Sequence, residues 1–174
     1  MPLLAVPNTL MYLPKQPQLQ PQLQTVKILK LPHAYKAPKY KSAEAAGMDI
    51  YAAEDVSIPF NSVRTIATGF KIILPKGTVG LIKARSGMYS KHLIEVDGVI
   101  DSDYRGEVFV MLHNTNSFTH VTDFQIKRGE RIAQMVITQL PKMTTEYISE
   151  EEFNSIEHKT VRGANGFGST GMGD

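Results

Sequence analysis

The stretch "GVIDSDYRGEVFVMLHN" (residues 98–114) joins a segment containing Asp, Ser and Gly to the apolar run "GEVFVMLHN". Aspartate, serine and glycine are common in turns, whereas valine, phenylalanine and leucine at such close spacing favour a strand. Comparable runs on both sides are separated by "IPFN", "LPKGT", "RSG", "VDG" and "KRGE". Many short strands with regular turn signals predict an all-β barrel or sandwich.

The other strand-like runs are "TVKILKL", "MDIYAAEDVSI", "SVRTIATGFKIIL", "TVGLIKA", "LIEV" and "RIAQMVITQL". Helical signals are weak, and only 86–92, with Ser86 and Gly87 at its entry, and 149–156 predict short helices. No alternation of strands and helices indicates a parallel α/β sheet. A mostly-β domain of this kind has exposed sheet edges, and a closed oligomer is one way to cover them.

The composition limits the classes of function. The 174 residues suit one domain, and the net charge of +2 gives no large basic field for nucleic acid. The chain has no cysteine, which excludes disulfides, cysteine-ligated metals and thiol catalysis. No apolar run approaches the ~18 residues of a membrane span. The sequence shows no secretory or Arg-rich transit signal, so we expect an intracellular protein without a membrane partner, in cytoplasm or nucleus.

Three regions differ in composition. Residues 1–24, which end in the repeat "PQLQPQLQ" (17–24), predict a disordered Pro/Gln-rich arm or a segment that binds an unknown partner. Residues 25–161 hold the predicted β domain. Residues 162–174, "RGANGFGSTGMGD", are rich in glycine, which is typical of a flexible tail or of a loop that lets backbone amides approach a ligand.

Two carboxylates, Asp101 and Asp103, lie two residues apart in the opening stretch. On a strand both would point to one face, whereas at a turn one would point inward and one outward. We expect the acid flanked by Val99, Ile100 and Tyr104 to be partly desolvated, which suits a general base. A solvated turn is the alternative interpretation.

Other stretches suit the binding of anions. "ARSG" (84–87) places Arg85 between a predicted strand and a predicted helix, where backbone N–H groups and a guanidinium favour phosphate oxygens. In "RGANGFGSTG" (162–171) the glycines, hydroxyls and arginine have the ingredients of a phosphate loop, and an aromatic ring is available to cover a base. Asp49 follows a glycine at a strand start, and Gln134 lies in an otherwise apolar strand.

Five stretches, "AGMDIYAAED", "RSG", "GVIDSDYRGEV", "GERIAQMVI" and "RGANGFGSTG", occur in the order and approximate spacing of the five motifs of trimeric dUTP diphosphatases (dUTPases). The chain resembles this family over residues 25–171. The resemblance implies a jelly-roll-like distorted β-barrel with one short helix. It also implies a homotrimer with composite sites, in which the first, second and fourth motifs come from one subunit, the third from another and the fifth from the third subunit.

The resemblance implies hydrolysis of dUTP to dUMP and pyrophosphate with Mg²⁺. This reaction limits the incorporation of uracil into DNA and supplies dUMP for thymidylate synthesis. Asp101 matches the carboxylate that activates the attacking water, and Tyr104 matches the ring that packs under deoxyribose and excludes a 2′-hydroxyl. The backbone of Gly98, Val99 and Ile100 matches the segment that reads uracil.

The resemblance also assigns residues that bind the triphosphate. Arg85, Ser86 and Gly87 match phosphate contacts of the second motif. Asp49 and Gln134 match residues that hold waters bound to magnesium or phosphate, so that the metal has no direct protein ligand. The C-terminal clamp, 162–174, closes over a neighbouring subunit's site. Its matching residues contact the γ-phosphate and cover the uracil: Arg162, Gly168, Ser169 and Thr170 for the phosphate, and Phe167 for the base.

The chain departs from the family pattern at two places. Ala84 precedes Arg85 where proline is common, and Asp97 stands before Gly98 where a small residue is usual, in an approach one residue shorter than in some members. Two alternative functions stay open. One is a relative of the dCTP deaminases, which share the fold, and the other is a regulatory module with this fold.

Overall fold

The computed structural model describes residues 24–115, 123–155, 160 and 163. Contacts within the chain divide it into two compact units, Met1–Leu140 and Pro141–Asp174. Arg162, Phe167, Gly168, Ser169 and Thr170 lie outside the described residues, as do most of the predicted arm and the boundary at 161/162. No helix among the described residues is long and apolar enough to cross a membrane.

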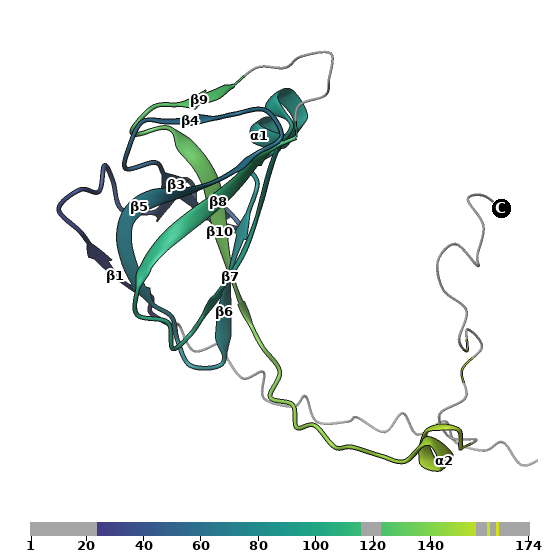
Figure 1. The fold of residues 1–174 in the computed structure, drawn as a ribbon. Coiled ribbons are helices and arrows are strands. Elements are labelled where there is room, and N and C mark those ends of the chain that lie inside the picture. The colour runs from purple at the N-terminus through teal and green to yellow at the C-terminus, as the bar shows by residue number, and fades with distance from the viewer. Residues whose placement is uncertain (1–23, 116–122, 156–159, 161–162, 164–174) are drawn as a thin grey trace, which may run out of the picture. The chain divides into compact units, whose positions relative to one another are not determined.

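The described part of the first unit is built on antiparallel sheet, with one short helix (Figure 1). Eight strands pair in the order β1-β5-β8-β7-β6-β10-β3-β2, and β4 pairs with β9. Their bounds are β1 Lys27–Lys30, β2 Lys39–Tyr40, β3 Met48–Tyr51, β4 Val56–Ile58, β5 Val63–Ile73, β6 Thr78–Lys83, β7 Ile94–Asp101, β8 Glu107–Asn114, β9 Phe124–Ile126 and β10 Arg131–Gln139. The large sheet curls around a core, which confirms the predicted all-β class.

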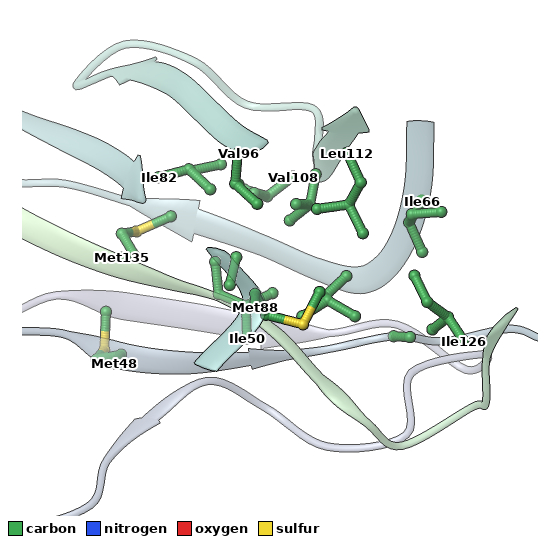
Figure 2. Packing of buried hydrophobic residues seen from close by; sticks show 14 of the residues in the cluster. Met48, Ile50, Ile66, Ile82, Met88, Val96, Val108, Leu112, Ile126 and Met135 are labelled. Carbon is green, nitrogen blue, oxygen red and sulfur yellow. The ribbon is translucent and has the colours of Figure 1, made fainter. Parts of the chain in front are cut away.

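The core forms because inward residues alternate with outward ones. In β8, Val108, Val110 and Leu112 are fully buried, whereas Phe109 and Met111 are exposed. Figure 2 shows Val108 and Leu112 in the core cluster together with Val96 of β7 and Ile66 of β5, and the cluster also includes Ile82 and Met135. Burial of this apolar surface supplies the main stabilisation of the sheet, at about 25 cal/mol per Å².

Both predicted short helices are present. Helix α1, Ser86–His92, begins after Arg85 and buries Met88 in the core. Its backbone ends at Leu93, which adopts a left-handed conformation. Helix α2, Glu150–Phe153, belongs to the second unit, and the Ser149 hydroxyl accepts a hydrogen bond from the Glu152 N–H.

The structure corrects three details. "VDG" (96–98) is no turn, because β7 runs on to Asp101 and Gly98 pairs with Ile82 of β6. The run "MDIYAAEDVSI" divides into β3 and β4, since the alanines between them are buried in a connection. The very short strands β2 and β9 were not predicted, because two or three residues carry too little alternation to reveal a strand.

Candidate active site

The first predicted cluster surrounds Asp49 on β3. One carboxylate oxygen of Asp49 lies 3.1 Å from Arg85 Nε, and the other lies 3.2 Å from Arg131 Nη1. The Asp49 side chain is only 14% exposed, so both ion pairs are partly shielded from water. The Asp49 carboxylate therefore pairs with two guanidinium groups. Asp49, Arg85 and Arg131 together carry a net positive charge.

Strand order brings these residues together. β10 lies between β3 and β6, and Gln134 stands opposite Asp49 on one side and Lys83 on the other. The Gln134 amide donates to the Ala84 carbonyl at 3.2 Å, which ties β10 to the residue before Arg85. Because β3, β6 and β10 are far apart in sequence, only the folded sheet places the first, second and fourth motifs side by side.

Ser86 and Gly87 open helix α1 directly after Arg85. Arg85 itself has an extended backbone, and its carbonyl accepts the first hydrogen bond of the helix from the Met88 N–H at 2.9 Å. A Cβ atom on Gly87 would meet nothing within 4 Å, so the space over this residue is open.

An open cleft of about 690 Å³ adjoins the Asp49 cluster. Positive side chains outnumber negative ones among its lining residues: Lys36, Lys39, Lys41, Arg85 and Arg131 against Asp49 and Glu130. Such a wall favours a multiply charged anion such as a triphosphate. Sequence reasoning missed Arg131 and the three lysines. Arg131 stands within the quoted stretch "GERIAQMVI", but its tie to Asp49 is visible only in the folded sheet.

The second predicted cluster lies where β7 ends. Asp101 is the last residue of β7 and Asp103 follows in the turn, and both are exposed. The expectations that Asp101 is partly desolvated and that a turn would direct one carboxylate inward are therefore wrong for the single chain. The reason is that Val99 beside it is itself 62% exposed, so this neighbour does not cover the carboxylate.

The backbone of Gly98–Ile100 forms a partly open strand edge. β7 pairs with β6 from Asp97 to Asp101, but its ladder with β8 covers only Ile94–Val96. In an antiparallel pair, alternate residues direct both backbone groups to the same neighbour. Some N–H and C=O groups of this segment therefore face away from β6, beyond the end of the β8 ladder.

Tyr104 is fixed by local hydrogen bonds. Its hydroxyl donates to the Glu107 carbonyl at 2.8 Å, and its N–H donates to the Asp101 carbonyl at 3.1 Å. The ring lies against Gly106, where an added Cβ atom would come within 2.3 Å of the hydroxyl oxygen. Asp101 and Tyr104 thus belong to one compact turn.

The chain does not bring its two clusters together. Asp101 stands opposite Val79 near the start of β6, whereas Arg85 follows the end of β6 at Lys83. The strand advances four steps from Val79 to Lys83, or roughly 13 Å, and Arg85 lies further on. A second open hollow, of about 710 Å³, adjoins Asp101.

The unusual residue Asp97 is paired across the sheet. Its carboxylate accepts a hydrogen bond from the Lys83 ammonium directly opposite on β6. This hydrogen bond and the lysine charge hold the pKa of Asp97 below its usual value. Asp97 therefore stays ionised and points away from the core, next to Gly98.

The described residues contain no group of three His, Cys, Asp or Glu side chains placed to hold a metal ion. Asp49 is the acidic group of the first cluster, and both of its oxygens already face arginines. Each carboxylate oxygen keeps a further lone pair. Asp49 therefore fits a role in accepting hydrogen bonds from the waters of a hydrated Mg²⁺, which binds proteins through few direct contacts.

A curled antiparallel sheet with a cationic, carboxylate-centred cleft defines a β protein with an anion site. Residues 33–171 match the family model for dUTPase. The chain is 46% identical over 137 residues to the deoxyuridine 5'-triphosphate nucleotidohydrolase of Candida albicans, covering 78% of this chain and 81% of that protein. With the Wolbachia pipientis subsp. Culex pipiens protein of the same name it shares 44% identity over 153 residues, covering 84% and 95%.

Solved structures agree. The Staphylococcus bacteriophage 80alpha dUTPase with dUPNHPP superposes with a TM-score of 0.73 at 29% identity, covering 86% of this chain and 99% of that one. The chain belongs to the dUTPase family.

Proposed function

We propose that this chain hydrolyses dUTP to dUMP and pyrophosphate. The family match over residues 33–171 carries the proposal, because that range holds both clusters described above. A similar phage enzyme has been solved with the nucleotide dUPNHPP, which supports a nucleotide in the corresponding cleft here. The reaction removes dUTP, which limits uracil in DNA, and it supplies dUMP for thymidylate synthesis.

In the proposed mechanism Asp101 accepts a proton from a water molecule as that water attacks the α-phosphorus. The new bond joins the water oxygen to phosphorus, and the bond to the bridging oxygen of the β-phosphate breaks in line with it, so that pyrophosphate leaves. Positioning and neutralisation of charge supply most of the rate enhancement in such reactions. When bound, Mg²⁺ neutralises part of the triphosphate charge.

The chain's other residues bind and orient the substrate. Arg85, with Ser86 and Gly87, takes phosphate oxygens, and Asp49 fixes the guanidinium of Arg85 while accepting hydrogen bonds from waters on Mg²⁺. Gln134 holds a further water. Backbone groups of Gly98–Ile100 read uracil, and Tyr104 packs under the deoxyribose. Arg162, Phe167, Gly168, Ser169 and Thr170 close over the γ-phosphate and the base.

We further propose that the active unit is a homotrimer with shared sites. The separation of Asp101 from Arg85 supports this, since the two residues of one chain lie toward opposite ends of β6. The exposure of Asp101 and Val99 supports it too, because a neighbouring subunit would cover them. Burial by that neighbour would also supply the desolvation that a general base requires.

A substrate comparison tests the activity. Release of pyrophosphate is measured with dUTP, dTTP, dCTP and UTP in parallel, and ammonia release is measured with dCTP. We expect pyrophosphate from dUTP well above the other three. Ammonia from dCTP would indicate a deaminase instead, and no turnover of any nucleotide would indicate a regulatory module.

A mixing experiment tests the shared sites. Asp101→Asn and Arg85→Ala are each expected to be nearly inactive, and the two proteins are then unfolded, mixed and refolded together. In a trimer that draws Asp101 and Arg85 from different subunits, about one quarter of the sites regain both residues on statistical mixing. Recovery near that level supports shared sites, whereas no recovery by refolded trimers would show that each chain supplies both residues.

A further inference from the structure

Strand β5 carries a bulge opposite the start of β8. The register pairs Ala67 with Phe109 and then Lys71 with Glu107, so four steps along β5 match two steps along β8. Gly69 lies in the bulge with φ of +75°, and a Cβ atom there would come within 2.3 Å of Ala34 Cα. Only glycine fits at this position.

The Glu107 side chain fills the bulge. Its Oε1 accepts a hydrogen bond from the Gly69 N–H at 2.8 Å and lies 2.9 Å from His33 Nε2. The carboxylate is 15% exposed, so its contacts compete little with water. One residue later, the Val108 carbonyl accepts a hydrogen bond from the Thr68 hydroxyl. The bulge thus holds Glu107 and Val108, the first two residues of β8, by hydrogen bonds.

The same residue anchors the predicted sugar-binding ring. The Tyr104 hydroxyl donates to the Glu107 carbonyl, and the Tyr104 N–H donates to the Asp101 carbonyl. Arg105 closes the turn with hydrogen bonds to the carbonyls of Ser102 at 2.9 Å and Tyr104 at 2.7 Å. A shift of Glu107 would therefore move Tyr104 relative to Asp101.

The two arms of this turn are held by different strands. The arm that ends at Asp101 pairs with β6, and the arm that begins at Glu107 pairs with β5. The ladder between β7 and β8 ends at Val96 and Leu112, so it does not reach the turn. The contact of Glu107 with the β5 bulge therefore sets where the second arm stands.

We propose that Glu107 is a positioning residue that determines sugar specificity, because it fixes the start of β8 against Gly69 and thereby places Tyr104 relative to Asp101. The proposal rests on the proposed function, in which Tyr104 excludes a 2′-hydroxyl. If the contact of Glu107 with Gly69 were lost, the Tyr104 ring would move more freely. The site would then accept a 2′-hydroxyl, and so a ribonucleotide, more readily.

The test compares kcat/KM for dUTP with kcat/KM for UTP in four variants. Glu107→Ala is expected to lower the dUTP/UTP ratio by about tenfold, the equivalent of one hydrogen bond to a charged group. Glu107→Asp, one methylene shorter, should lower it by about threefold, and Glu107→Gln should stay within about twofold of the parent because its amide oxygen still accepts from Gly69. Glu54→Ala is the matched control, since Glu54 accepts the Ala67 N–H of the same strand at 3.0 Å.

A second measurement needs no activity. Hydrogen exchange of the nucleotide-free protein should be faster across 101–108 in Glu107→Ala, and unchanged there in Glu54→Ala. A parental dUTP/UTP ratio in Glu107→Asp, or an equal fall in Glu54→Ala, would overturn the proposal, as would parental exchange across 101–108 in Glu107→Ala. Absence of dUTP turnover in the parent would refute the proposed function alone, and the exchange measurement would then decide the positioning role.

Discussion

The two ends of β6 carry the two halves of the proposed site, and they differ in how they are held. At the Arg85 end, ion pairs join residues from β3, β10 and the start of α1 around the shielded Asp49. At the Asp101 end, the functional side chains stand on one turn, are exposed and are tied mainly to their own neighbours. The first end is held by long-range pairing, and the second by local hydrogen bonds and the Glu107 contact.

This difference predicts that changes at the Arg85 end reduce stability, whereas changes at the Asp101 end reduce activity. A change at Asp49 disturbs the contacts of β3 with β10 and with the start of α1, whereas a change at Asp101 alters an exposed carboxylate of the single chain with little effect on its packing. In the proposed trimer, a neighbouring subunit would cover the exposed carboxylate of Asp101.

Asp101→Asn should lower turnover of dUTP by at least about 100-fold, because an amide cannot accept the proton of the attacking water. Binding of a non-hydrolysable dUTP analogue, measured by calorimetry, should persist. Asp103→Asn is the matched control, since it changes an exposed aspartate in the same turn and should keep near-parental turnover. Parental turnover in Asp101→Asn would remove Asp101 as the base.

Asp49→Ala should lower the free energy of unfolding by about 2 kcal/mol, because two neighbouring guanidinium groups lose their shared acceptor. Asp101→Ala should change it by less than about 0.5 kcal/mol, because within the described part of its own chain the Asp101 carboxylate forms no ion pair. Urea unfolding at one protein concentration measures both, since assembly makes stability depend on concentration. Equal losses in the two variants would contradict the contrast between the two ends.

Glu107→Gln should cost about 1 kcal/mol of stability at neutral pH, and this cost should disappear in acid. Burial alone would raise the pKa of Glu107, but hydrogen bonds from His33 and the Gly69 N–H outweigh it and hold the pKa below its usual value. A lowered pKa means that the ionised carboxylate stabilises the fold fully above the ordinary value, about 4.3.

That contribution is lost as the pH falls through the lowered pKa of the folded protein. Urea unfolding of the parent and Glu107→Gln from pH 7 downward should therefore give curves that converge in acid. A difference that stays constant with pH would show that ionisation of Glu107 contributes nothing.

Lys83→Ala should have the smallest effect. The Lys83–Asp97 pair is solvent-exposed, with side chains 48% and 75% exposed, and such pairs contribute little to stability. We expect no measurable change in the thermal midpoint and near-parental turnover of dUTP. A rise in KM without a change in midpoint would instead show that the pair shapes the approach to Gly98.

Much of the fold follows from local pattern. Alternation in "GEVFVMLHN" predicts β8 correctly, and the short helix after Arg85 follows from residues at its entry. The "VDG" prediction failed because Gly98 is a strand residue facing Ile82, and local composition does not distinguish this from a turn. β2 and β9 depend on a partner strand for their existence, so no local signal reveals them.

The candidate site shows the same limit. Asp49, Arg85, Gln134, Asp101 and Tyr104 were predicted as functional residues, and their roles stay predictions. Sequence analysis missed Arg131 and the lysines of the cleft. Local sequence does not distinguish an arginine that lines a site from other charged surface residues. Desolvation of Asp101 was expected from its apolar neighbours, but Val99 and Tyr104 are exposed in the single chain and Ile100 packs against the core instead.

The sequence by itself determined the strand-forming segments, the turns that need glycine and the residue types available for phosphate chemistry, because these depend on neighbours along the chain. Only the tertiary structure decided which of those residues meet. The order β6-β10-β3 places Arg85 beside Asp49, and the register of β6 with β7 keeps Asp101 at the other end. Strand order and register arise from burying one face of the whole sheet, so no short segment contains them.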